Sequence, residues 1–133
     1  RLQSDLKITN PFITVAGQSA PGDGVQIRDA QVTVQTHDVV LRYLKIRSGD
    51  APSSSDNCCR NSLFLDGLGG REVYNVVVDH STLIWGPDTG GVEMGENVHD
   101  VTVQWSINGE GLYFSNHYEG SRTQGTPRGS GLR

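Results

Sequence analysis

The sequence has few cysteines, few aromatic residues, no basic surplus and no long hydrophobic run. Of its 133 residues, 2 are cysteines and 7% are aromatic. The longest uninterrupted apolar stretch has only a few residues, whereas a bilayer span needs about 20, so we expect no membrane association. The chain carries 11 lysines and arginines against 15 aspartates and glutamates, a net charge of −4. Proteins that bind nucleic acid usually carry excess positive charge, so we expect no nucleic-acid partner.

The two cysteines are adjacent in the sequence, at Cys58 and Cys59. Neighbouring Cα atoms lie about 3.8 Å apart, which is below the usual span of a disulfide, so a bond between these two residues would be strained. No pair of cysteines or histidines has the spacing of a zinc site. The sequence therefore predicts two free or partly buried thiols in a loop.

The length of the chain fits one domain. Valine, isoleucine, leucine and phenylalanine recur in clusters throughout, which argues against a disordered chain. An acidic chain with 17 glycines is typical of a turn-rich surface that binds cations.

The apolar residues form short segments rich in β-branched side chains and bounded by glycine, asparagine or aspartate. Alternation with a period of two is clear at Val32 and Val34, at Leu44 and Ile46, and from Val101 to Trp105. No sustained helical periodicity is present, so long helices are not expected. The predicted strands lie at 12–15, 25–27, 32–34, 39–46, 63–65, 74–78, 92–94 and 101–105.

One unit recurs, in which a polar residue or proline precedes a β-branched strand and a turn. Four such units begin at Pro11, Asp38, Asn75 and Asp100. Strand units repeated at intervals of a few tens of residues, without helices, favour a solenoid. The alternative on pattern alone is a sandwich of antiparallel hairpins, with turns at the pairs 23–24, 66–67 and 108–109.

Four stretches resemble the pectate-lyase-like polysaccharide lyases, in the order found in that family. They read NPFITVAGQSAPGDG at 10–24, THDVVLRYLKIRSGD at 36–50, VVVDHSTLIWGPD at 76–88 and VTVQWSI at 101–107. The resemblance covers about residues 5–120 and implies an all-β fold, a right-handed single-stranded parallel β-helix. We expect about five coils over residues 1–117, a loop insertion at 51–61 and an irregular glycine-rich tail at 118–133. The predicted interior residues are Val15, Ile27, Val34, Leu41, Leu65, Val76, Val78, Val101 and Val103.

The same resemblance implies calcium-dependent β-elimination of polygalacturonate. Pectate is a polyanion, and an acidic protein would repel it unless a metal ion bridges the two. Ca²⁺ takes about 6–8 oxygen ligands, so protein carboxylates and uronate oxygens can share it. Bound to a uronate carboxylate, the cation stabilises the carbanion-like species formed when the C5 proton leaves. In lyases of this type an arginine is believed to remove that proton.

Three residues match positions of the family's calcium ligands. Asp88 matches an acidic stretch, although relatives often have a second acid where Thr89 stands. Glu93 falls near the next ligand position, and Asn61 replaces an expected acid, which should lower the calcium affinity. The alternative is that Asp88 and Glu93 are solvated acids of turns.

Other residues match structural or site-adjacent positions of the family. Asp79 and His80 match a pair that is largely structural and ties neighbouring coils together, and Asp79 is also a candidate neighbour of the calcium. Trp85 precedes the acidic stretch. It could stack on a sugar ring, as could Trp105, Tyr113 and Tyr118, although aromatic residues of solenoids more often fill the core.

No catalytic residue is identified from the sequence. The family's arginine lies on a later coil, and residues 118–133 contain no recognisable Arg-x-Pro-x-Arg segment. Arg122, Arg128 and Arg133 stand among glycines, which is more typical of a flexible tail than of a catalytic coil.

Two functions therefore stay open: a pectate lyase, and a non-catalytic β-helix module that binds carbohydrate or serves as structure. We expect an acidic polysaccharide as partner and an extracellular location, although the first residues show no secretion signal. The sequence resembles the central coils of a longer β-helix. Because uncapped solenoid ends expose apolar side chains and unpaired backbone, we also expect end-to-end association of copies.

Overall fold

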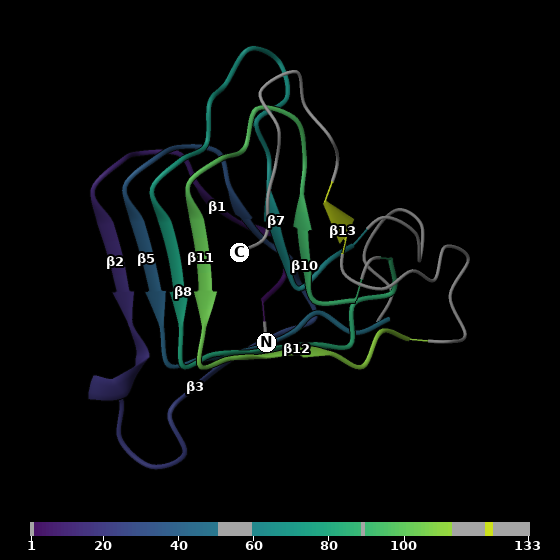
Figure 1. Cartoon of the computed structure of the whole chain (residues 1–133). Helices are drawn as coiled ribbons and strands as arrows, with labels where there is room; N and C mark the ends of the chain where they lie inside the picture. The colour runs from purple at the N-terminus through teal and green to yellow at the C-terminus, as the bar shows by residue number, and fades with distance from the viewer. Residues whose placement is uncertain (1, 51–59, 89, 113–121, 124–133) are drawn as a thin grey trace.

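The computed structural model describes residues 2–50, 60–88, 90–112 and 122–123, the last pair by backbone alone. Its strands form three sheets, here called A, B and C (Figure 1). Sheet A contains β1 (Leu6–Ile8), β4 (Val32–Val34), β7 (Leu63–Leu65), β10 (Val92–Met94) and β13 (Arg122–Thr123). Sheet B contains β2 (Ile13–Ala16), β5 (Val39–Arg42), β8 (Val76–Asp79) and β11 (Val101–Gln104). Sheet C contains β3 (Val25–Arg28), β6 (Leu44–Arg47), β9 (Thr82–Ile84) and β12 (Ile107–Gly109), and a short 3-10 helix, η1 (Gly17–Ser19), follows β2.

The chain passes from sheet A to sheet B to sheet C and then returns to sheet A. Each circuit is one coil, and the described residues form four complete coils and the first strand of a fifth. All strand pairings between successive coils are parallel, as where Ile13 stands beside Val39 and Val39 beside Val76. This topology confirms the predicted parallel β-helix and excludes, for the described ranges, a sandwich of antiparallel hairpins.

The four repeated units of the sequence are the four strands of sheet B, which lie side by side in Figure 1. The first unit begins one residue later than the repeat suggests. Phe12, not Pro11, stands before the strand at the position that Asp38 occupies in the next coil, because Ile13 pairs with Val39.

The corners that flank sheet B are tight because each contains a residue with positive φ, except the corner after β2, where η1 follows the strand. Aspartate and asparagine tolerate this left-handed conformation better than most residues, which explains their place before the β-branched runs. The bulky corner residues after the strands support one another, since the rings of Tyr43 and His80 stack with centroids 4.8 Å apart. The residues with positive φ are Phe12, Asp38, Asn75 and Asp100 before the strands and Tyr43, His80 and Trp105 after them.

The core fills the space enclosed by the three sheets. Of the nine predicted interior residues, five are fully buried: Val34, Leu41, Leu65, Val76 and Val78. The other four pack against this core but are only partly buried: Val15, Ile27, Val101 and Val103. These four lie in the first and fourth coils, where a neighbouring coil covers their sheet from one side only. Burial in a solenoid therefore depends on the coil as well as on the direction of the side chain.

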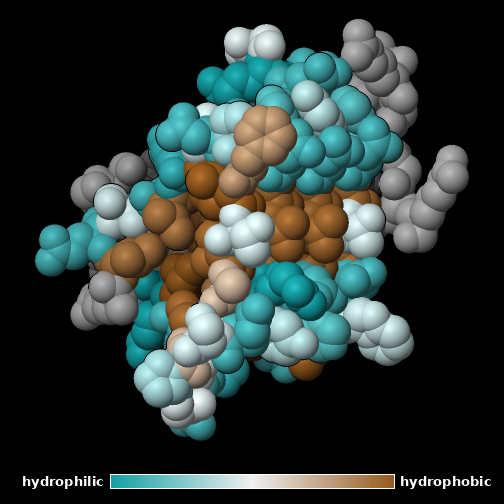
Figure 2. All heavy atoms as spheres, turned by 90° about the vertical axis from the view of Figure 1, so that its left-hand side faces the viewer, coloured by the Kyte–Doolittle hydropathy of each residue, from teal (hydrophilic) through white to brown (hydrophobic). Residues whose placement is uncertain are grey.

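The open side of the first coil exposes this apolar cross-section. In Figure 2 a hydrophobic band crosses the face on the side of β2, with polar surface above and below it. Leu6, Phe12 and Ile13 are among the exposed large apolar side chains at this end. At the opposite end, Ile107 and Trp105 are exposed, Trp105 by 81%. Both ends of the described solenoid therefore present apolar side chains.

The predicted insertion and tail fall mainly outside the described residues, as do Cys58, Cys59, Thr89, Tyr113 and Tyr118. Within the predicted irregular tail, Arg122–Thr123 forms β13, which pairs with β10. The physical reason is that the free edge of β10 offers backbone groups that a short extended segment can pair with. No helix in the described ranges has the length and apolar character needed to cross a membrane.

Candidate functional site

Two of the three predicted calcium ligands are in direct contact. Asn61 comes just before β7 and is 1% exposed, and Glu93 is the middle residue of the neighbouring strand β10. The Asn61 side-chain Nδ2 donates a hydrogen bond of 2.6 Å to Glu93 Oε2. Parallel pairing of β7 with β10 brings these residues together from positions far apart in the sequence.

The third predicted ligand, Asp88, lies beside the same pair. It is 6% exposed and sits in the turn between β9 and β10. Its backbone N–H donates to the carbonyl oxygen of Arg60, the residue before Asn61, at 3.2 Å. Asp88 and Asn61 therefore lie where the chain passes from sheet C back to sheet A. We call this region the C-to-A corner, meaning the described residues between the end of each sheet C strand and the next sheet A strand.

The described side chains of this corner offer few oxygen atoms to a cation. No three His, Cys, Asp or Glu side chains of the described ranges lie close enough together to hold a metal ion. Asn61 presents its amide N–H group, not its oxygen, to Glu93. Ca²⁺ needs about 6–8 oxygen ligands. This corner offers two carboxylates, Asp88 and Glu93, and one amide, whose N–H group points at Glu93.

Trp85 also belongs to the C-to-A corner. It follows β9, and its indole Nε1 donates to Glu110 Oε2 at 3.1 Å. Its carbonyl oxygen accepts a hydrogen bond of 2.8 Å from the Gly49 N–H, while the Gly49 carbonyl accepts one of 3.1 Å from Arg60 Nη1. The backbone at Gly49 therefore connects Trp85 to Arg60 and so to the Asn61 and Glu93 pair.

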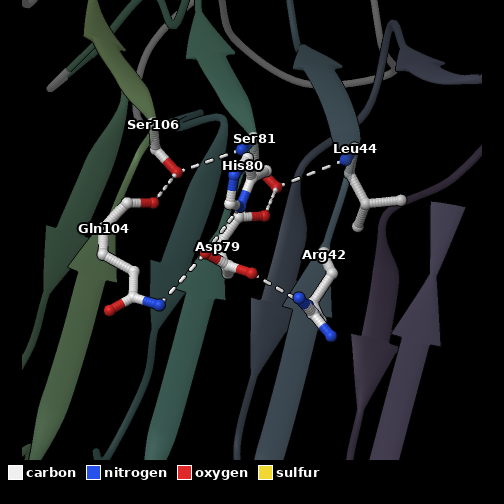
Figure 3. Close-up of polar contacts among 7 residues, drawn as sticks. All are labelled: Arg42, Leu44, Asp79, His80, Ser81, Gln104 and Ser106. Carbon is white, nitrogen blue, oxygen red and sulfur yellow. Dashed lines mark hydrogen bonds and ion pairs between the residues drawn. The ribbon is translucent and has the colours of Figure 1, made fainter. Parts of the chain in front are cut away.

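Asp79 and His80 lie at a different corner, between sheets B and C (Figure 3). Asp79 Oδ2 accepts from Arg42 Nε at 2.9 Å, and Asp79 Oδ1 accepts from Gln104 Nε2 at 3.1 Å. Asp79 Oδ1 also lies 2.8 Å from Nδ1 of His80. Since Arg42 and Gln104 come from the coils on either side, one carboxylate connects three coils. Asp79 is thus a residue of sheet B, whereas Asn61 and Glu93 lie on sheet A.

The electrostatics of Asp79 agree with this position. Burial alone would raise the pKa of the carboxyl group, but hydrogen bonds from Gln104, His80 and Arg42 together hold the pKa of Asp79 below its usual value. The ionised carboxylate is therefore the form that the fold stabilises. That contribution is present above the ordinary pKa of aspartate, and it is lost as the pH falls through the lowered pKa of the folded state.

Replacing Asp79 with Asn should lower the melting temperature by about 5 °C or more at neutral pH, because the amide cannot accept from all three donors. The variant should also lose less stability than the parent protein when the pH falls below about 4, since the titrating group is gone. Thermal melts followed by circular dichroism from pH 3 to pH 7 measure both effects. Asp23→Asn, which removes the same charge from an exposed loop, is the control. Equal melting of Asp79→Asn and the parent would contradict the assigned role.

Several residues in and beside the C-to-A corner were not predicted from the sequence. Arg60 is 6% exposed, and the guanidinium of Arg47 lies over the Trp85 ring at 4.9 Å from its centroid. Glu110 anchors the indole from the next coil. The alternation in β6 was the only signal for Arg47. Because Leu44 and Ile46 are buried, the side chain of Arg47 is expected to point outward.

The fold and these contacts define a parallel β-helix protein with a polar site at the outer corner between two of its sheets. The chain is similar to curated proteins named probable pectate lyase C. The relative from Aspergillus flavus is 30% identical over 110 residues, which are 82% of this chain and 24% of that protein. For Aspergillus fumigatus the identity is 31%, and for Aspergillus terreus 26%, over the same number of residues and with the same shares. The chain therefore spans about a quarter of the length of these relatives.

No protein-family model matches the chain, and no solved structure matches it significantly. The similarity to the named relatives covers most of the chain, and the topology is the one that the resemblance implies. The comparisons thus support a relationship between this chain and the pectate lyase-like proteins, over 82% of the chain.

Proposed function

We propose that this β-helix acts on pectate, as part of a polysaccharide lyase that cleaves polygalacturonate by β-elimination. The observation that carries the proposal is the similarity to proteins named probable pectate lyase C, over 82% of the chain. The polar C-to-A corner supports it, because candidate site residues lie together there. Because the substrate would be a plant polysaccharide, we also propose that the chain acts outside the cell.

The reaction needs a base for the C5 proton of a uronate. Removal of that proton, followed by cleavage of the bond between C4 and its glycosidic oxygen, leaves a double bond between C4 and C5. The family resemblance gives this role to an arginine on a later coil, and we propose none of the described side chains for it. An arginine with a pKa above about 12 needs a strongly electropositive setting to accept a proton.

Calcium dependence follows from the family resemblance. The described donors at Asn61, Asp88 and Glu93 offer fewer oxygens than calcium requires, so we propose weaker calcium binding than an acid at position 61 would give. The same observation favours a second candidate function. A corner that keeps the polysaccharide contacts without a full ligand set would act as a non-catalytic module that binds an acidic polysaccharide.

The absorbance of unsaturated products from polygalacturonate separates the two functions. The full chain is incubated with the polymer in added calcium and, separately, in chelator. Product formation supports the lyase, and its loss in chelator supports calcium dependence. Binding of the polymer without any product would support the non-catalytic module.

We also propose that copies of this chain associate end to end. The first coil exposes Leu6, Phe12 and Ile13, and the described edges of β1, β2 and β3 pair with a strand on one side only. Exposed apolar side chains beside unpaired strand edges favour pairing with another copy. Light scattering should show a mass that rises with concentration. A monodisperse monomer of about 14 kDa at high concentration, matching the 14.4 kDa chain, would contradict association.

A further inference from the structure

The outer face of sheet C carries a row of positive side chains on a protein with net negative charge. Strand β6 buries Leu44 and Ile46, so the intervening Lys45 and the final Arg47 face outward. On the neighbouring strand β3, Arg28 pairs in register with Arg47. Residues in register on adjacent parallel strands lie about 4.8 Å apart at the backbone, so the two guanidinium groups start from adjacent positions on the same face.

These cations differ in how they are compensated. Arg28 Nε lies 3.6 Å from Asp29 Oδ2, and Lys45 Nζ donates to the backbone carbonyl of Asp23 at 2.7 Å. Arg47 is different, because its Nε is buried and finds no hydrogen-bond partner within the described part of the chain. A buried donor without an acceptor costs free energy, and like charges in adjacent strand positions repel. An anion bound to the guanidinium would lower the repulsion and compensate the charge of Arg47.

Trp85 holds the Arg47 guanidinium in place and leaves aromatic surface beside it. The Arg47 Cζ lies 4.9 Å from the centroid of the indole, within the range of a cation–π contact. The indole is fixed by its hydrogen bond to Glu110, and Trp85 is 41% exposed. A planar guanidinium that is fixed on a ring can present its N–H groups to a carboxylate with little further loss of conformational freedom.

We infer that Arg47 and Trp85 form a binding subsite for a uronate residue of an acidic polysaccharide, at the edge of the C-to-A corner. The sugar carboxylate accepts hydrogen bonds from the Arg47 guanidinium, and the apolar side of the sugar ring packs on the exposed part of the indole. This inference rests on the proposed function for the class of polymer. It adds a positive subsite on sheet C, separate from the Asn61 and Glu93 contact on sheet A.

The chemistry favours a uronate over other anions. A guanidinium matches a carboxylate through two parallel hydrogen bonds, and an adjacent aromatic ring suits a sugar. Nucleic acids are a poor fit because the chain is acidic overall. The acids that face this region, Asp29 and Glu110, are engaged with Arg28 and with the Trp85 indole. Of the positive charges in this region, that of Arg47 is therefore the one we expect a sugar carboxylate to bind.

Calorimetric titration of the full chain with a galacturonate hexamer, without added calcium, tests the subsite. Arg47→Gln should weaken binding by about tenfold or more, the usual effect of losing a charge-assisted hydrogen bond. Arg47→Lys should also bind more weakly than the parent chain, because a lysine keeps the charge but not the planar pair of donors. Arg71→Gln is the charge-matched control, since Arg71 pairs with Asp66 on the opposite side of sheet A. Cooperative melting of each variant confirms that it folds. If Arg47→Gln does not fold, the affinity of Arg47→Lys decides the test.

Unchanged affinity of the Arg47 variants would overturn the inference, as would equal binding of dextran sulfate with the same dependence on Arg47. A neutral hexamer of galactose should not bind measurably. Because the titration needs no turnover, its result is independent of the lyase proposal. Arg47-dependent binding without any cleavage would keep the subsite and reject the lyase. Cleavage whose KM is unchanged in Arg47→Gln would keep the lyase and reject the subsite.

Discussion

An Asn61→Asp variant should be less stable than the parent chain in chelator and should bind calcium at least about tenfold more tightly. In the parent chain the Asn61 amide donates to Glu93 Oε2 at 2.6 Å. An aspartate at this position would place two carboxylates against each other, and both cannot remain ionised at that distance without a cation between them. Calcium would remove the repulsion and add an oxygen ligand, so it should restore the lost stability.

Thermal melts in chelator and across a calcium titration measure this effect. We expect the melting temperature of Asn61→Asp to fall by about 5 °C or more in chelator and to recover with calcium. Asn97→Asp introduces the same charge at an exposed corner residue and is the matched control. If Asn61→Asp melts like the parent chain with and without calcium, the contact between positions 61 and 93 is not the calcium position that the family resemblance implies.

A Gly86→Ala substitution should disrupt the C-to-A corner as a whole. Gly86 follows Trp85, and a Cβ atom built on it would overlap the backbone carbonyl of Gly90 across the turn. The Gly86 carbonyl also accepts a hydrogen bond from the Leu112 N–H of the next coil. Because the obstacle is backbone on both sides, the turn must move, and we expect a loss of about 3 kcal/mol of unfolding free energy.

The displaced turn carries Trp85 and Asp88, so galacturonate binding should fall together with stability. Gly109→Ala is the matched control, because no atom lies within 4 Å of the Cβ that it would add and its φ is not positive. Denaturant unfolding followed by tryptophan fluorescence, with calorimetry on the folded variants, gives both values. A Gly86→Ala chain as stable as Gly109→Ala would mean that the turn adapts without cost.

The repeat in the sequence favoured a solenoid, and the family resemblance was needed to predict the parallel β-helix. Aspartate or asparagine before a β-branched run marks three corners of sheet B, since these residues tolerate the positive φ that the corner requires. The alternation within each strand also identifies the side chains that face inward. The degree of burial could not be predicted in this way, because Val15 and Val101 alternate like Leu41 but lie in coils that a neighbour covers on one side only.

The candidate site was predicted in part. Motif order singled out Asn61, Asp88 and Glu93, and the structure brings Asn61 into contact with Glu93 and Asp88 beside them. Arg47 could not be found from motifs, because its significance lies in a contact with Trp85 on the next coil and in a donor left without a partner. Such contacts depend on the lengths of the connections between coils, which local residue patterns do not specify.

Nuclear magnetic resonance on the full chain tests most directly that the C-to-A corner binds an acidic polysaccharide. Addition of a galacturonate hexamer to the labelled protein should shift the Trp85 indole N–H, the Arg47 Nε–H and the backbone amides of Asn61 and Asp88. The signals of the Asp79 network at the corner between sheets B and C should stay in place. No shift on saturation with the hexamer, or shifts confined to Asp79, His80 and their neighbours, would contradict the account.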